Sequence, residues 1–144
     1  MEIDLPRYIA HRGAMQVAPE NTLFAMSEAL HLGASWVECD VRLSSDHKAV
    51  IIHDRSLKRT TNGKGRVDQT SFAQLRTLSA SPDCNSEVLI PSLEEMLQFV
   101  HANNLGLNLE VKVPFKNMHI FCAELMRIMK QVPVRNEKFL ISLS

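Results

Sequence analysis

Two acidic side chains, Glu38 and Asp40, stand two residues apart in the stretch WVECDVRL. Because side chains alternate across a strand, a strand over Trp36–Leu43 places both carboxylates on one face and Val37, Cys39, Val41 and Leu43 on the other. Two carboxylates on an inward face repel each other and lose hydration, so they require a cation or a proton. An exposed edge strand that carries solvated acids is also compatible with the alternation. The two readings differ in whether this face is buried.

A histidine is expected to join these acids through a hairpin. The segment between Trp36–Leu43 and the apolar stretch Ala49–His53 is too short for a parallel crossover, so the second strand returns antiparallel. A turn centred near residues 45–46 pairs residues whose numbers sum to about 91, which sets His53 opposite Glu38. A one-residue slip sets it opposite Cys39. Either register brings His53 next to both acids.

A third acid, Glu110, lies in the strand predicted over Leu107–Lys112. A parallel strand in register sets Glu110 at the height of Glu38 and Asp40, with Lys112 just above. Three oxygen ligands without thiolates suit a hard cation, Mg²⁺ or Ca²⁺. His11 and Arg12 follow the strand predicted over Tyr8–Ala10, and active sites on such sheets gather at the C-terminal strand ends.

The elements that must position these residues alternate between strands and amphipathic helices. Asn21 is expected to cap a first helix that stops at Gly33, and capping boxes open helices after Ser71 and Ser92. A longer helix is predicted over Lys116–Val132, followed by a strand from Phe139. This alternation predicts a parallel sheet and the α/β class.

Composition bounds the remaining possibilities. The chain has 144 residues, 45% of them hydrophobic, with sixteen basic and sixteen acidic residues, which indicates one globular domain without a field that recruits nucleic acid. Its three cysteines are widely spaced, which argues against a disulfide scaffold. The sequence shows neither a signal peptide nor a membrane span, so we expect a cytoplasmic protein.

Several short motifs occur in a fixed order along the chain: HRG, PENT, ECD, HD with LKRTTNGKG, PSLEEML and NLEVK. From about residue 8 to 144 the sequence resembles the glycerophosphodiester phosphodiesterases. The resemblance implies a (β/α)₈ TIM-type barrel. Only four barrel strands are predicted here, so we expect residues 1–144 to form a C-terminally incomplete domain, the N-terminal half of the barrel with a β-hairpin arm.

The resemblance also implies an activity and a role for each site residue. The family hydrolyses glycerophosphodiesters to sn-glycerol 3-phosphate and an alcohol, so the partner is a small-molecule substrate. General acid and base roles fall to His11 and His53, and the divalent-cation ligands are Glu38, Asp40 and Glu110. The remaining matches are phosphate-binding or orienting residues: Arg12 and Lys112 for the phosphate, Glu20 and Asp54 for orientation.

Two alternatives accompany this interpretation. A truncated, inactive pseudoenzyme would bind a phosphodiester or a metal without turnover, and a structural reading makes the acids a salt-bridge floor with Lys112 and Arg42. Which histidine is the acid, and whether water attacks directly or a cyclic phosphate forms first, stay open. We also expect self-association through the open strand edges at Tyr8–Ala10 and Phe139–Leu143, since unpaired edges attract other strands.

Overall fold

The computed structural model describes residues 5–82, 88–134 and 138–143. Its strands and helices alternate along most of the chain, as the α/β class requires. The strands are β1 (Ala10–His11), β2 (Trp36–Leu43), β3 (Ala49–Ile51), β4 (Gly106–Val111) and β5 (Phe139–Leu143). The helices are α1 (Leu23–His31), α2 (Phe72–Leu75), α3 (Leu93–Ala102) and α4 (Met118–Met129), with 3₁₀ turns η1 (Val67–Gln69) and η2 (Phe115–Asn117).

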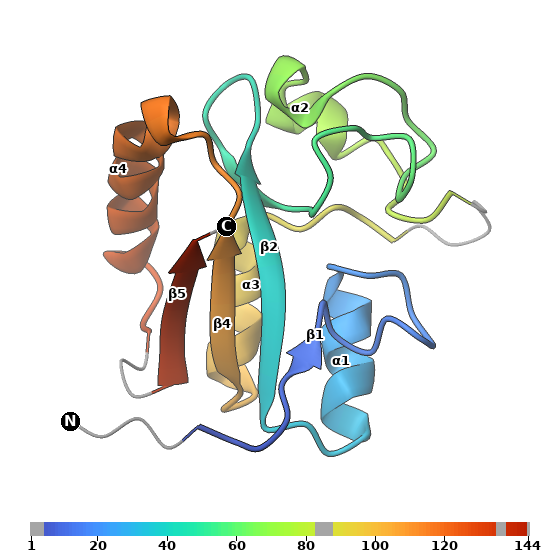
Figure 1. Ribbon diagram of the computed structural model, residues 1–144, viewed down its shortest axis with the longest axis vertical. Coiled ribbons are helices and arrows are strands. Elements are labelled where there is room, and N and C mark those ends of the chain that lie inside the picture. The colour runs from blue at the N-terminus through green and yellow to red at the C-terminus, as the bar shows by residue number, and fades with distance from the viewer. Residues whose placement is uncertain (1–4, 83–87, 135–137, 144) are drawn as a thin grey trace.

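The strands form one sheet in the order β1-β2-β4-β5, in which every neighbouring pair is parallel. The short strand β3 is the predicted hairpin arm and pairs antiparallel with β2. In Figure 1, α3 lies behind the sheet, while α1 and α4 stand on its two sides. The predicted α/β class and parallel sheet are therefore confirmed.

One face of the sheet is the main hydrophobic core. Along β2 the alternate residues Val37, Cys39, Val41 and Leu43 are buried in it, together with side chains from α1, α3, α4 and β4. Full burial of one such aliphatic side chain contributes about 1.5–3 kcal/mol. A register slip of one residue would send Glu38 and Asp40 into this core, so burial fixes which face carries the acids.

A second, smaller core holds the segment that follows β3. It consists of apolar residues from β3, the loop after it and α2: Val50, Ile52, Leu57, Val67, Leu75, Ala80 and Ile90. Since α2 has only four residues, this burial, rather than intrinsic helix stability, accounts for the ordered path of the segment. The segment is thereby held against the acid-bearing side of the sheet's edge.

Several predicted strand boundaries were wrong by one or two residues. Strand β1 lies at Ala10–His11 instead of Tyr8–Ala10, and β3 ends at Ile51. The hairpin register pairs residues whose numbers sum to 92, as in Val41 with Ile51, which is the alternative one-residue slip. The ladder stops before His53 because the chain turns away after the Ile52 N–H donates to the Asp40 carbonyl at 2.9 Å.

The predicted helix starts are confirmed at two places and wrong at two. Ser71 and Ser92 form the expected capping boxes. The first helix is capped by Thr22, whose hydroxyl accepts from the Ala25 N–H, and not by Asn21. The last helix begins at Met118, because residues 115–117 form the 3₁₀ turn η2.

Candidate active site

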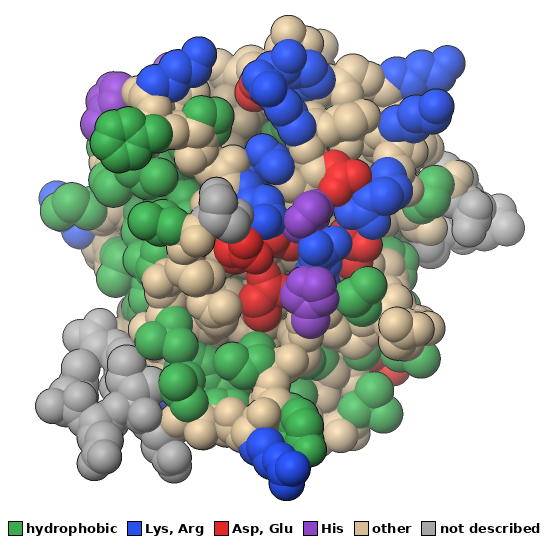
Figure 2. All heavy atoms as spheres, in the orientation of Figure 1, with side chains coloured by type: hydrophobic (Ala, Val, Ile, Leu, Met, Phe, Trp, Pro, Cys, Tyr) green, Lys and Arg blue, Asp and Glu red, His purple; other side chains and the backbone are tan. Residues whose placement is uncertain are grey.

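Three carboxylates meet on the acid-bearing face of the sheet. Asp40 on β2 and Glu110 on β4 are direct register partners, and Glu38 pairs with His11 of β1. One oxygen from each of Glu38, Asp40 and Glu110 lies within 4.8 Å of the other two. Figure 2 shows acidic side chains gathered at the centre of this face, with basic and histidine side chains around them. The sequence-predicted carboxylate group is thus brought together by strand register.

Burial sets the electrostatics of this group. Asp40 is fully buried and Glu38 is 6% exposed, so the edge-strand alternative with solvated acids is wrong. Burial raises the pKa of Glu38 to about 7, and the negative charges of Asp40 and Glu110 add to the increase, while the Arg12 N–H opposes it. Near neutral pH, the Glu38 carboxyl group is therefore partly protonated.

Two cationic side chains adjoin the carboxylates. Arg12 Nε lies 3.2 Å from Asp40 Oδ2, and Arg12 Nη1 donates to Glu20 Oε1 at 3.0 Å. Lys112 Nζ donates to Glu110 Oε1 at 2.8 Å and lies 3.5 Å from Asp40 Oδ1. The positive charges of Arg12 and Lys112 partly offset the negative charges of the buried acids.

The turn after β1 explains how Arg12 reaches this position. Arg12 has a φ of +56° and Gly13 a φ of +79°, so the chain reverses sharply through the left-handed region. A side chain at Gly13 would lie 2.7 Å from the Ala25 backbone carbonyl, which only glycine avoids. The turn directs the Arg12 backbone N–H at Glu38 Oε2, at 3.0 Å.

Of the two predicted histidines, His11 adjoins the carboxylate group, and His53 pairs with the neighbouring Asp54. His11 Nε2 lies 3.8 Å from Glu38 Oε2, and its side chain is 59% exposed. His53 is partly buried, and its Nδ1 lies 2.6 Å from Asp54 Oδ1. If Nδ1–H of His53 donates to Asp54, Nε2 is the ring nitrogen without the proton.

Asn21 is a site residue that sequence reasoning missed. Its side chain accepts from the Asp40 N–H at 3.1 Å and donates to Asp40 Oδ2 at 2.9 Å, and its own φ is +59°. It therefore fixes the orientation of the buried Asp40 carboxylate. The available signal was the pair Asn21–Thr22, since only one of two adjacent capping residues is needed to start the helix.

Arg59 is the second residue that the sequence analysis did not single out. Its guanidinium lies 2.7 Å from both Glu20 Oε2 and Asp54 Oδ2. These contacts lower the pKa of both carboxyl groups below their ordinary values, with the Arg59 hydrogen bond as the largest cause in each case. Both acids are therefore ionised at neutral pH.

The carboxylate group fits a hard divalent cation. Among the described residues, buried oxygens that accept no hydrogen bond include Glu38 Oε1 and Asp40 Oδ1. Asp40 Oδ1 has Lys112 Nζ at 3.5 Å, so Glu38 Oε1 is the oxygen that a further cation would stabilise most. Oxygens on opposite sides of Mg²⁺ or Ca²⁺ are about 4–5 Å apart, given bonds of about 2.0–2.6 Å, which matches the observed spread of 4.8 Å. The three carboxylates could therefore hold a divalent cation.

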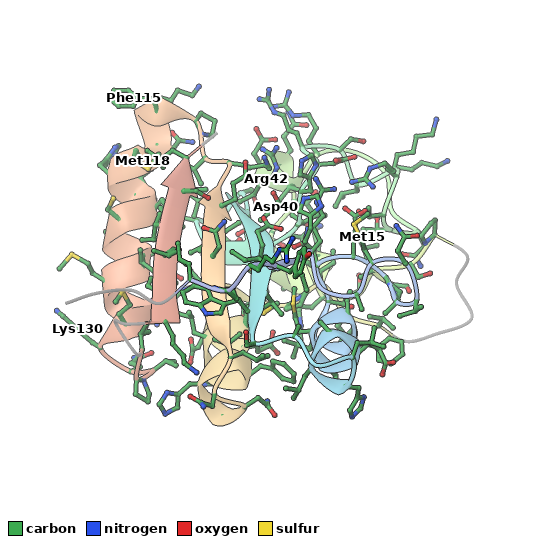
Figure 3. The ribbon with its side chains drawn as sticks, turned by 60° about the horizontal axis from the view of Figure 1, so that its bottom comes forward. Met15, Asp40, Arg42, Phe115, Met118 and Lys130 are labelled. Atoms are coloured by element: carbon green, nitrogen blue, oxygen red, sulfur yellow. The ribbon has the colours of Figure 1, made fainter. Side chains whose placement is uncertain are left out.

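The salt-bridge alternative describes only part of this arrangement. Lys112 does pair with two of the acids, as that reading expects. Arg42 instead donates to carbonyl oxygens, from Nε to His53 at 2.6 Å and from Nη1 to Lys112 at 3.0 Å. Figure 3 shows Asp40 and Arg42 close together near the middle of the site. Arg42 therefore anchors the backbone of two site residues.

A parallel sheet that carries acidic and basic side chains together on one face defines an α/β protein with a charged site. The sequence matches the glycerophosphoryl diester phosphodiesterase family over residues 11–140. The chain belongs to this family.

Curated relatives and solved structures agree with this assignment. A glycerophosphodiester phosphodiesterase of Bacillus altitudinis is 40% identical over 112 residues, which cover 75% of this chain and 46% of the relative. Glycerophosphodiester phosphodiesterase 1 of Rattus norvegicus is 39% identical over 111 residues, covering 72% and 33%. The chain thus spans less than half the length of these relatives.

The structural comparison places the sheet within a larger fold. An Oleispira antarctica phosphodiesterase, solved in complex with the product sn-glycerol-3-phosphate, has a TM-score of 0.90 and 37% identity, covering 96% of this chain and 57% of that one. The enzyme from Agrobacterium tumefaciens gives a TM-score of 0.81 at 30% identity, covering 94% and 56%. The fold is that of a partial TIM-type barrel, as the sequence predicted.

Within the described ranges, no helix is long and apolar enough to cross a lipid bilayer. Two of the three cysteines, Cys39 and Cys122, are free thiols. Cys84 lies outside the described residues.

Proposed function

We propose that this chain carries the site for metal-dependent hydrolysis of glycerophosphodiesters to sn-glycerol 3-phosphate and an alcohol. The observation that supports the proposal most directly is the cluster of Glu38, Asp40 and Glu110, whose oxygens lie within 4.8 Å of one another. His11 and Arg12 adjoin it on one side and Lys112 on another. The product complex of the Oleispira antarctica phosphodiesterase supports the substrate class.

The charged residues would bind the anionic phosphodiester and stabilise the charge that develops on it. Glu38, Asp40 and Glu110 would hold Mg²⁺ or Ca²⁺, which when bound polarises a phosphoryl oxygen and lowers the pKa of a nearby hydroxyl. Arg12 and Lys112 would stabilise the charge that builds on the non-bridging oxygens. Glu20 orients Arg12 through the 3.0 Å contact between Oε1 and Nη1.

The histidines would transfer the protons. One imidazole accepts the proton of the attacking hydroxyl while the hydroxyl oxygen forms a bond to phosphorus. The other imidazole donates a proton to the oxygen of the leaving alcohol as the bond between that oxygen and phosphorus breaks. Asp54 fixes the ring of His53 through Nδ1, so His53 would act through Nε2. Either histidine can take either role, and either water or a substrate hydroxyl can be the nucleophile.

The test is an assay of glycerol 3-phosphate release from glycerophosphocholine by the purified chain with Mg²⁺ or Ca²⁺. We expect a bell-shaped dependence of kcat/KM on pH, and a loss of at least about a hundredfold in H11A and H53A. His119 on the exposed side of α4 provides the control variant H119A, which should retain full activity.

Two outcomes would contradict the proposal. Retained activity in H11A or H53A would show that the substituted histidine transfers no proton in the reaction. Metal binding without any turnover by the unaltered chain would instead support the inactive, metal-binding alternative. The cytoplasmic location, the incomplete domain and the self-association stay predictions from the sequence.

A further inference from the structure

Arg59 occupies a junction between two carboxylates that belong to different parts of the site. It lies in the segment between β3 and α2, where it forms four hydrogen bonds. Nε and Nη2 donate to the two oxygens of Asp54, at 2.7 and 2.9 Å. Nη1 and Nη2 donate to the two oxygens of Glu20, at 2.7 and 2.8 Å. One guanidinium thus grips both carboxylates in bidentate fashion.

Each of these carboxylates also contacts a residue to which the proposed function gives a role. Asp54 Oδ1 lies 2.6 Å from His53 Nδ1, and Glu20 Oε1 accepts from Arg12 Nη1 at 3.0 Å. A continuous chain of contacts therefore runs from His53 through Asp54, Arg59 and Glu20 to Arg12. It connects the hairpin arm with the turn that follows β1.

We propose that Arg59 is a positioning residue that holds Asp54 against the His53 ring and Glu20 against Arg12. The inference rests on the proposed function, in which His53 transfers a proton. A carboxylate gripped at both oxygens cannot rotate, so Asp54 Oδ1 stays directed at Nδ1. That contact fixes the tautomer of His53 and leaves Nε2 as the nitrogen that can accept a proton.

An ordinary surface ion pair is the simpler reading of these contacts. The Arg59 side chain is 47% exposed, and exposed ion pairs contribute little to stability. Such a pair would affect neither the histidine ring nor turnover. The four hydrogen bonds of Arg59 to two carboxylates favour a positioning role. A lysine at this position would supply the same charge but could not hold two planar carboxylates at once.

The test compares R59K and R59A with the unaltered chain. R127K is the matched control, because Arg127 forms a similar two-bond contact with Glu124 on α4, at 2.7 and 3.0 Å. Two readouts are measured: the ¹⁵N and ¹H resonances of the His53 ring, assigned with H53Q, and the kinetics of glycerophosphocholine hydrolysis. The resonances require no turnover.

We expect R59K and R59A to shift the His53 Nδ1 resonances toward those of a freely exchanging ring. Loss of a residue that orients a site group costs about 10–100-fold, so kcat should fall by at least about tenfold. Methylguanidinium added to R59A should restore part of the lost kcat, since it can occupy the space of the missing fork. R127K should change neither readout.

An unchanged His53 spectrum in R59K and R59A would overturn the proposal, whatever happens to kcat. So would an unchanged kcat in an active chain. If the unaltered chain shows no turnover, the proposed function fails for this chain, while the His53 resonances still decide whether Arg59 positions the ring. The two failures are therefore distinguishable.

Discussion

Binding of Mg²⁺ to the carboxylate group should release a proton from Glu38. Without a metal, burial and the adjacent acids raise the pKa of Glu38 to about 7, so its carboxyl group holds a proton at lower pH. At pH 6 about one Glu38 carboxyl in eleven is ionised, and at pH 8 about ten in eleven. Because only the ionised form is a good ligand, Mg²⁺ affinity should rise about tenfold from pH 6 to pH 8, or about 1.4 kcal/mol.

Isothermal titration calorimetry with Mg²⁺ measures both quantities. Titrations in buffers with different heats of ionisation report the protons released, which should be about half a proton per ion at pH 7. In E38Q the affinity should be weaker and should vary little with pH, because an amide does not titrate. H11A separates the contribution of the neighbouring imidazole, which lies 3.8 Å from Glu38.

Two results would refute this reasoning. An affinity that is constant between pH 6 and 8 would mean that Glu38 is already ionised in the metal-free chain. A pH dependence that persists unchanged in E38Q would assign the released proton to another group.

Further predictions concern the groups around the carboxylates and the strand edges. N21A should weaken Mg²⁺ binding by about 10–100-fold, because Asp40 loses both of its contacts with the Asn21 side chain. Calorimetry measures the affinity, and circular dichroism should show that the fold is intact. An unchanged affinity would mean that Asn21 does not orient the Asp40 carboxylate. G13A should lower the free energy of unfolding by about 2–4 kcal/mol in urea titrations, because it combines a backbone clash with a positive φ; unchanged stability would show that α1 shifts freely. Light scattering after size-exclusion chromatography should detect association through the edge strands β1 and β5, and a monomer at all concentrations would contradict it.

The carboxylate cluster could be predicted because it depends on local rules. Alternation along a strand separates Glu38 and Asp40 from Val37 and Cys39, and burial of the apolar set then fixes the register against β4. The structure pairs Asp40 directly with Glu110, as an in-register parallel strand requires. Capping boxes at the starts of α2 and α3 are equally local, since four consecutive residues form each one.

The remaining site residues depend on contacts that no local pattern encodes. Asn21 leaves the cap to Thr22 because its side chain binds Asp40, nineteen residues away. Arg59 is one of several arginines in the segment after β3, and only the folded path of that segment shows which one meets Glu20, thirty-nine residues away. Long-range polar contacts of this kind are decided by tertiary structure, so spacing in the sequence did not single them out.

The close contact at Gly13 couples the position of helix α1 to the geometry of the site. The turn that bears Arg12 lies directly on the α1 backbone, since the Ala14 N–H donates to the Ala25 carbonyl at 2.9 Å and no side chain fits between Gly13 and Ala25. Any substitution in the core that moves α1 will move this turn with it. Such a substitution would also move the Arg12 N–H that donates to Glu38. Because this hydrogen bond lowers the pKa of Glu38, apolar residues that contact neither metal nor substrate can change how readily that carboxyl group ionises.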